Sequence, residues 1–100
     1  MHASIRRYKK TATAELTRRV NQEFLPLISN APGFVAYYAI DAGDGVWASV
    51  SVFDSREGAE RSNRLAAEWI AKNLPSSTTG QPEITAGEVV AHSLAAHAVA

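Results

Sequence analysis

The segment APGFVAYYAIDAGDGVWASVSVFD, residues 31–54, constrains the fold more than any other part of the sequence. It contains Asp44-Gly45, a dipeptide typical of tight hairpin turns, because glycine accepts the positive φ that such turns need. The sequence therefore predicts two antiparallel strands, residues 34–41 and 46–53, joined at this turn. Apolar residues do not alternate with polar ones along either strand, so neither face of the hairpin is polar.

The pairing of the two strands decides which side chains share a face. An even number of loop residues places the even positions of the first strand beside the odd positions of the second. One face then holds Phe34, Ala36, Tyr38, Ile40, Trp47, Ser49, Ser51 and Phe53, and the other holds Val35, Tyr37, Ala39, Val46, Ala48, Val50 and Val52. An odd number exchanges the partners, yet neither arrangement leaves a polar face. Both sides of the sheet must be covered, because monomers avoid large apolar patches in water.

Helical spacing of apolar residues predicts one helix on each side of the hairpin in the sequence. The first spans residues 13–29, and Pro26 is expected to kink it or end it near Phe24, since proline lacks the amide that a helix interior needs. The second spans residues 55–74 and is the most regular element, with Asp54 expected as its N-cap in a capping box.

Weaker strand patterns occupy residues 3–9 and 83–92. The order strand, helix, strand, strand, helix, strand is typical of the α+β class with a ferredoxin-like βαββαβ fold. Right-handed crossovers place both helices on one face of a four-stranded antiparallel sheet. The sequence predicts a single domain over residues 1–100, with its core at 4–92 and a C-terminal tail at 93–100.

Two helices cover only one face of such a sheet, so the open face needs a partner. A second copy related by a two-fold axis is the simplest cover, and we expect a homodimer through the open sheet face. The alternative is a monomer with an unusually apolar face. Ten basic and ten acidic side chains give a formal charge of zero, which permits self-association and offers no field for nucleic acid or an anionic membrane.

Several classes of chemistry are excluded by composition. The chain has no cysteine, which removes disulfides, thiolate nucleophiles and cysteine-ligated metals. The basic segment MHASIRRYKK is not followed by the apolar stretch of a secretory signal, and no run approaches the ~18 apolar residues of a membrane span, so a cytoplasmic protein is expected. His92 and His97 do not converge on a metal, and no metal or other cofactor is expected.

The segments APGFVAYY, after the first helix, and VSVFDSREGAE, before the second, resemble the antibiotic-biosynthesis monooxygenase-like proteins. The residues that carry the resemblance are Pro32, Gly33 and Phe34 at the entry to the second strand, and Phe53 and Asp54 at the exit from the third. The resemblance implies a dimeric α+β barrel with a small pocket between helices and sheet in each subunit. It also implies oxidation of aromatic or quinol substrates with O2, without metal or flavin.

Other proteins of this family degrade haem, which they bind through a histidine on the second helix. An asparagine on the first strand and a tryptophan on the third complete their pattern. Here residues 55–75 hold no histidine and the first ten residues hold no asparagine, so Trp47 alone matches. Haem degradation is therefore not expected.

Aromatic and hydroxyl side chains on one face supply a pocket for a planar ligand. The candidate pocket residues are Tyr38, Trp47, Ser49, Ser51, Asn63, Trp69 and His92. Asn63 is the group expected to orient a phenolate or hydroxyl, and His92 is the histidine considered for acid–base work. Packing in the core or dimer interface explains the aromatic residues equally well, and no catalytic residue is assigned.

Glu88 follows Ile84 and Ala86 in the phase of a strand, so its carboxylate is expected on an apolar face. Such a group needs a partner, and Arg6 or Arg7 on the neighbouring strand is expected to pair with it rather than leave it as a general base.

Two functions of different classes follow from these patterns. The first is a cofactor-independent monooxygenase-like enzyme acting on a small aromatic or quinone-like molecule. Deprotonation of the substrate would begin its reaction, and hydrogen bonds in the pocket would stabilise the resulting anion. The second is a non-catalytic homodimer that binds a small apolar ligand or a protein. A titratable group in the pocket would separate the two, and the sequence offers no convincing base.

Overall fold

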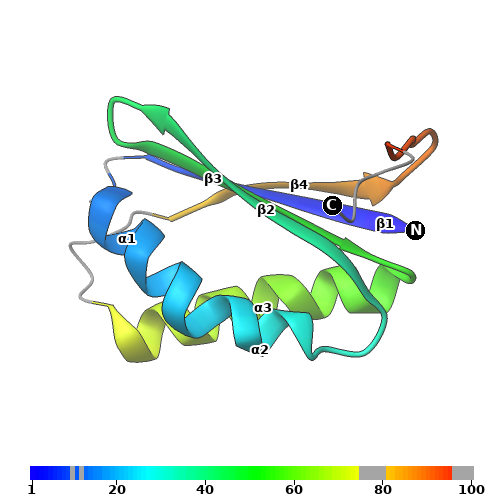
Figure 1. The fold of residues 1–100 in the computed structure, drawn as a ribbon, viewed down its shortest axis with the longest axis horizontal. Coiled ribbons are helices and arrows are strands. Elements are labelled where there is room, and N and C mark those ends of the chain that lie inside the picture. The colour runs from blue at the N-terminus through cyan, green and yellow to red at the C-terminus, as the bar shows by residue number, and fades with distance from the viewer. Residues whose placement is uncertain (10, 12, 75–80, 96–100) are drawn as a thin grey trace.

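A computed structural model of the chain describes residues 1–9, 11, 13–74 and 81–95. Its elements are β1 (His2–Tyr8), α1 (Thr13–Arg19), the π-helical turn η1 (Val20–Phe24), α2 (Leu25–Ser29), β2 (Phe34–Gly43), β3 (Val46–Phe53), α3 (Arg56–Asn73) and β4 (Glu83–Glu88). The strands form one antiparallel sheet in the order β2-β3-β1-β4. Figure 1 shows α1, α2 and α3 on the same side of this sheet. The predicted α+β ferredoxin-like fold is therefore confirmed.

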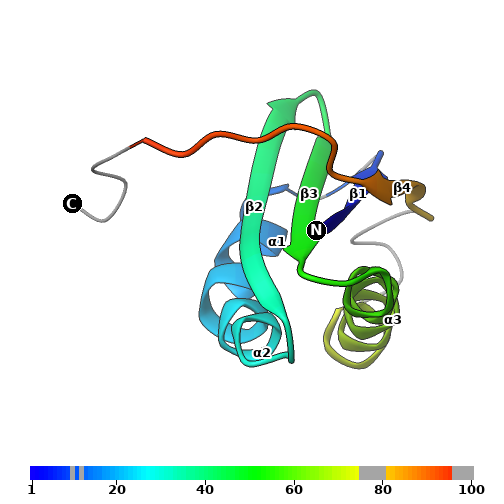
Figure 2. The same cartoon turned by 90° about the vertical axis from the view of Figure 1, so that its right-hand side faces the viewer.

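The two central strands bury alternate residues against the helices, as the pleat of a strand requires. On β3 every second residue from Trp47 to Phe53 is buried, and on β1 the buried residues are Ser4, Arg6 and Tyr8. The apolar core fills the space between the sheet and the two helical segments that Figure 2 shows end-on below it. Polar residues lie among the buried ones at the centre of the sheet, which is where the candidate site is found.

The hairpin turn is Asp44-Gly45, as predicted, with φ of 54° and 76°. The faces of β2, however, differ from those expected for this even loop. The register shifts between Asp41 and Gly43, and again between Phe34 and Ala36. Each irregularity inserts one unpaired residue and turns the following side chains to the opposite face.

Tyr38 therefore lies opposite Val50 on the open face, where it is 58% exposed, and the prediction that it shares a face with Trp47 is wrong. Ala36 and Ile40 move with it, since they pair with Val52 and Ala48. In their place, Tyr37 lies on the helix side, paired in register with Ser51.

Pro26 interrupts the first helix without ending it. The amide of Leu25 donates to the carbonyl of Val20, the five-residue step of a π turn, and Pro26 lies in the first turn of α2, where no amide is needed. The interruption expected near Phe24 is confirmed as η1, and the helical path continues to Ser29. The π turn keeps both Val20 and Phe24 buried against the sheet.

The cap of α3 corrects the sequence prediction by one residue. Ser55, not Asp54, is the N-cap, and its hydroxyl accepts from the Gly58 amide at 3.1 Å. Asp54 instead donates its amide to the carbonyl of Gly33 at 2.9 Å, which ties the start of β2 to the end of β3. Gly33 has φ +78°, a conformation that glycine adopts without strain.

Gly58 brings the first turn of α3 close to Phe53, which gives a stability prediction. A Cβ at Gly58 would lie 2.8 Å from the Phe53 ring and 2.9 Å from its Cβ. Gly58→Ala is expected to lower the free energy of unfolding by about 1–3 kcal/mol, because the helix must move off the sheet. Gly87→Ala on β4 is the matched control, since nothing lies within 4 Å of its added Cβ. Equal urea midpoints for the two variants would contradict this account.

The face of the sheet turned away from the helices exposes apolar side chains on β1 and β2, with the charged Arg7 and Glu83 toward the β4 edge. Ile5, Tyr38 and Ile40 are 42%, 58% and 49% exposed there. The partly buried Val50 lies between Ile5 and Tyr38, and the partly buried Val52 lies two residues further along β3. These five residues define the open face. An apolar face without a cover was predicted, but Tyr38 and Ile40 reach it only through the register shifts of β2.

β4 ends at Glu88, earlier than the predicted residue 92. Glu88 pairs with His2, the first residue of β1, and the Val89 amide donates to the Met1 carbonyl at 2.9 Å. Residues 89–95 follow as an extended arm that leaves the body of the molecule (Figure 2), with Val90 and Leu94 89% and 77% exposed. His97 and the end of the predicted tail lie outside the described residues. Within the described part of the chain, no helix combines the length and hydropathy of a membrane span.

Candidate functional site

The centre of the molecule buries a charged side chain, Arg6 of β1, which is 1% exposed. The pleat of β1 places Arg6 on the helix side together with Ser4 and Tyr8, while Arg7 faces the other way and is exposed. The neighbours of Arg6 in register are Ser49 on β3 and Ile84 on β4. The guanidinium therefore lies beneath α3, away from solvent.

Arg6 is bound by neutral acceptors from two other elements. Its Nη1 donates to Asn63 Oδ1 at 2.8 Å and to Ser62 Oγ at 3.2 Å, both on α3. Its Nη2 donates to Ser51 Oγ on β3 at 2.6 Å. The Ser4 hydroxyl donates to the same Asn63 Oδ1 at 2.6 Å. The network thus joins β1, β3 and α3, and it fixes the orientation of the Asn63 amide.

The positive charge of Arg6 has no carboxylate acceptor among the described residues. Its Nε is buried and makes no hydrogen bond to the described part of the chain. Glu83 lies on the neighbouring strand β4, but its carboxylate pairs with Lys9 at 2.9 Å. Buried charges in proteins are normally paired, so an unpaired guanidinium with an unsatisfied donor marks this point as unusual.

A small cavity lies between Arg6, the sheet and both helical segments. Its lining residues are Arg6, Tyr8, Leu16, Val20, Phe24, Tyr37, Trp47, Ser49, Ala66, Trp69 and Ile70. The space open to the centre of a water molecule is about 10 Å³, close to the least that one water requires. Side chains therefore fill most of the space between helices and sheet.

Aromatic rings form the walls of this cavity. Phe24 lies between Trp69 and Tyr37, with ring centroids 5.5 and 5.7 Å apart. Trp47 is anchored by its indole Nε1, which donates to Thr17 Oγ1 at 3.0 Å. These tilted contacts are those that aromatic pairs prefer in a packed core.

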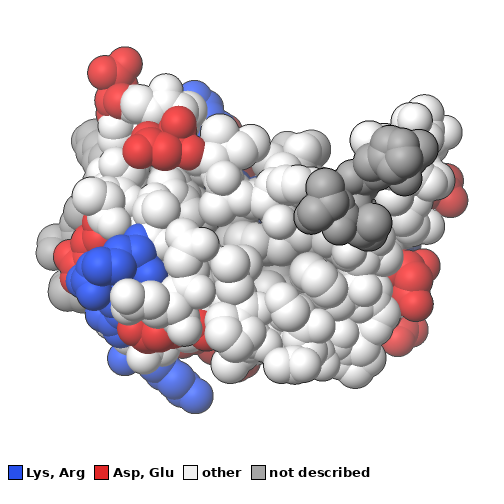
Figure 3. Space-filling model, in the orientation of Figure 1, with Lys and Arg blue, Asp and Glu red and all other residues white. Residues whose placement is uncertain are grey.

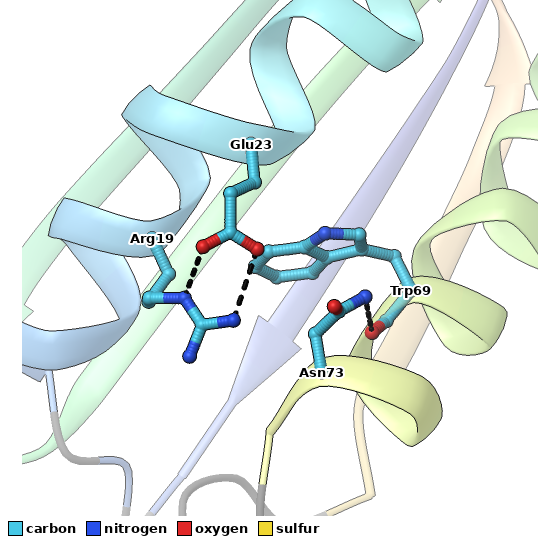
Figure 4. Close-up of polar contacts among 4 residues, drawn as sticks. All are labelled: Arg19, Glu23, Trp69 and Asn73. Carbon is cyan, nitrogen blue, oxygen red and sulfur yellow. Dashed lines mark hydrogen bonds and ion pairs between the residues drawn. The ribbon is translucent and has the colours of Figure 1, made fainter.

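Trp69 closes the cavity from the side of α3. Figure 4 shows its indole reaching toward the Arg19–Glu23 ion pair on the facing helical segment. Asn73 Nδ2 donates to the backbone carbonyl of Trp69 at 2.9 Å, one turn further along the helix. The tryptophan is therefore fixed between the two helical layers.

Two tyrosines beside Arg6 stay neutral over the ordinary pH range. Burial raises the pKa of both Tyr8 and Tyr37, and the Arg6 charge opposes this rise in each case without cancelling it. Neutral phenols of this kind donate hydrogen bonds and do not act as bases near neutral pH.

Alkaline pH is consequently expected to destabilise the fold. The pKa of each phenol is raised in the folded chain, so its contribution to stability is complete below about pH 10, the unfolded value, and is lost as pH rises through the folded pKa. Tyr8→Phe and Tyr37→Phe should each reduce this loss. Urea unfolding at neutral pH and above pH 10 measures it, and an unchanged loss in both variants would contradict the burial of these phenols.

A larger groove borders the same network between α3 and β4. Its volume is about 750 Å³, and its lining residues are Arg6, Tyr8, Asn63, Ala67, Ile70, Ala71, Leu74, Gln81, Pro82 and Ile84. This volume lies within the range of small-molecule sites in proteins, roughly 300–1,000 Å³. Arg6, Tyr8 and Ile70 line both spaces, so the small cavity and the groove meet beside Arg6.

The structure brings together most of the candidate pocket residues. Trp47, Ser49 and Trp69 line the cavity, Asn63 lines the groove, and Ser51 accepts from Arg6. Tyr38 lies on the opposite face of the sheet, and His92 is exposed in the arm beyond β4, so neither joins them. Glu88 is exposed and pairs in register with His2; the ion pair expected with Arg6 or Arg7 is not formed among the described residues.

Three residues at the centre of the site were not predicted: Arg6, Tyr8 and Tyr37. The alternation in ASIRRYK places Ser4, Arg6 and Tyr8 on one face, and this pattern was the available signal for a polar site on β1. Tyr37 could not be found in this way, because its face depends on the register shift near Asp41.

The donor set does not fit a metal or a haem. The residues that line the cavity and the groove include no histidine, cysteine or carboxylate. Within the described residues no group of three metal-ligating side chains converges. Neither space supplies a histidine, cysteine or methionine as an axial ligand for haem iron. Tyr8 and Tyr37 are the remaining candidates, and burial raises the pKa of both phenols, which disfavours the phenolate that would bind iron.

The sequence matches no model of a protein family and no curated protein. Its fold, in contrast, is shared with several solved structures. A protein of unknown function from Nitrosomonas europaea, NE2512, is 23% identical with a TM-score of 0.74, and the match covers 95% of this chain and 94% of that one.

Two further similar structures are those of a heme-degrader and of a cofactor-independent oxygenase. The heme-degrader MhuD of Mycobacterium tuberculosis is 20% identical with a TM-score of 0.69, over 93% of this chain and 99% of that one. SnoaB, a cofactor-independent oxygenase of Streptomyces nogalater, is 12% identical with a TM-score of 0.65, over 91% and 94%. The expected resemblance to the antibiotic-biosynthesis monooxygenase-like proteins is thereby confirmed at the level of the fold.

Proposed function

We propose that this chain is an antibiotic-biosynthesis monooxygenase-like protein that oxidises a small aromatic or quinone-like molecule with O2 and no dedicated cofactor. The observation that carries the proposal is the Arg6–Ser51–Asn63 network, which lies at the junction of an aromatic-walled cavity and a groove of substrate size. Hydrogen-bond donors fixed at such a point stabilise an oxyanion as it forms. The cofactor-independent oxygenase SnoaB, which shares the fold, supports the reaction class.

The chemistry requires a substrate that supplies all of the electrons. An anthrone-type methylene group loses its two hydrogens and gains one oxygen atom as a carbonyl, while the second oxygen atom of O2 leaves as water. The described residues that line the two spaces include no carboxylate or imidazole. The substrate proton is therefore released to water in the groove, and the protein's part is to stabilise the resulting phenolate or enolate.

The proposal includes a homodimer through the open face. Ile5, Tyr38 and Ile40 are too exposed for a stable single sheet in water, and the arm of residues 89–95 adds Val90 and Leu94. Seen from the side in Figure 3, in the orientation of Figure 1, the acidic and basic side chains gather toward the two ends of the molecule. A second copy, packed sheet against sheet, would cover the open face and receive the arm.

Oxygen uptake with a panel of quinols and anthrones tests the proposed reaction. The wild type should consume O2 faster than buffer with at least one member. Asn63→Ala should reduce the rate by about tenfold or more, because it removes an amide from the oxyanion site. Trp47→Phe should reduce it less, since a ring still fills the wall. Rates equal to buffer across the whole panel would contradict the proposal.

A second function is favoured by the filled cavity. The space beside Trp47 and Trp69 is about 10 Å³, too small for any aromatic substrate in this conformation. A non-catalytic homodimer that binds a small ligand in the outer groove would need no larger cavity. Ligand binding without O2 uptake would favour this function over the enzyme.

A further inference from the structure

Arg6 carries a buried positive charge whose partner is missing from the described chain. It is 1% exposed, its hydrogen bonds end on two serines and one asparagine, and none of these acceptors is charged. A guanidinium remains protonated in proteins, so the charge cannot be avoided by losing a proton. An anion at this point would compensate the cost of burying it.

Two hydrogen-bond donors near this charge remain available. Arg6 Nε is buried and makes no hydrogen bond to the described residues. The Asn63 amide uses Oδ1 to accept from Arg6 and Ser4, which leaves its Nδ2 as a donor with no partner in the described chain. Both residues line the groove between α3 and β4. A carboxylate or phenolate oxygen in the groove would accept from Asn63 Nδ2, and it would reach Arg6 Nε once the side chains that cover Nε move aside.

We propose that this groove binds a small aromatic acid, whose anionic oxygen pairs with Arg6 and Asn63. The rest of the groove suits the apolar part of such a molecule, because six of its ten lining residues are apolar: Ala67, Ile70, Ala71, Leu74, Pro82 and Ile84. No acidic side chain lines the groove to repel the anion, and Glu83 of the adjoining strand is already paired with Lys9. Charge-assisted hydrogen bonds in a partly desolvated groove are stronger than neutral ones, so the site selects an anion over its neutral isostere.

The site is proposed to select the charge of the ligand, whether or not the ligand is then oxidised. This selection applies equally to a substrate that is oxidised and to a ligand that is only bound. Absence of O2 uptake would therefore overturn the proposed enzyme and leave the anion site unaffected.

Naphthoate and naphthamide are suitable probes, because they share one ring system and differ in charge. Isothermal titration calorimetry on the full chain should show naphthoate binding about tenfold or more tightly than naphthamide. Arg6→Met should remove this preference and leave the naphthamide affinity within about threefold. Arg7→Met is the matched control, because the neighbouring guanidinium is exposed on the other face of β1, and it should keep the preference. Equal binding of the two probes to the wild type, or a preference that survives Arg6→Met, would overturn the proposal.

A second variant keeps the test decisive if Arg6→Met does not fold. Asn63→Asp is isosteric and places a carboxylate 2.8 Å from Arg6 Nη1, where the Asn63 oxygen lies now. The built-in anion should raise the melting temperature and abolish naphthoate binding. A lower melting temperature with naphthoate affinity unchanged would show that Arg6 needs no anion, and the proposal would fail.

Discussion

Replacing Ile5 with glutamate is expected to raise the dissociation constant of the proposed homodimer by about a thousandfold, equivalent to roughly 4 kcal/mol. Ile5 lies on β1 at the centre of the open face, opposite Val50 in register. In a two-fold interface the new carboxylate enters twice, and each copy loses water without gaining a partner. Sedimentation velocity over a range of concentrations measures the change.

Leu27→Glu provides the control for this experiment. Leu27 of α2 is 44% exposed, close to the 42% of Ile5, but it lies on the helix side of the sheet. It should leave the dissociation constant unchanged. If Ile5→Glu and Leu27→Glu dissociate the protein equally, or if neither does, the open face is not the interface.

Replacing Phe24 with alanine is expected to lower the free energy of unfolding by about 3–5 kcal/mol, the usual cost of removing a buried ring. Phe24 is 2% exposed, and its ring contacts both Trp69 and Tyr37 across the cavity. The vacated volume adds to the cavity, because the π turn and the sheet restrict how far the walls can collapse. This loss is a large part of the stability of an ordinary domain.

Urea unfolding at one fixed protein concentration measures this effect, since the stability of a dimer depends on concentration. Leu27→Ala, at an exposed position of the adjoining α2, should cost less than about 1 kcal/mol. A loss below that value for Phe24→Ala as well would show that the aromatic wall does not pack as described.

The order of elements could be predicted from sequence because each signal is local. Asp44-Gly45 specifies its turn by backbone conformation alone, and the helical pattern that ends at Leu74 needs no knowledge of the partner strands. The faces of β2 depend instead on two register shifts. No residue near Asp41 or Val35 indicates in the sequence that the register changes there. Tyr38 and Tyr37 were consequently assigned to the wrong sides of the sheet.

The candidate site was predictable in part, for a related reason. Ser51 and Asn63 were recognised as polar groups on inner faces, and both contact Arg6. Arg6 itself was considered only as a partner for Glu88, because a charged side chain on a strand is usually exposed. Its burial arises from the acceptors that β3 and α3 bring together, which tertiary structure alone reveals.

The open face of the sheet is expected to be covered by a second copy of the chain. Size-exclusion chromatography with light scattering at micromolar concentration measures this directly. It should give twice the chain mass of 10.7 kDa. A stable, well-behaved species of 10.7 kDa would contradict the account.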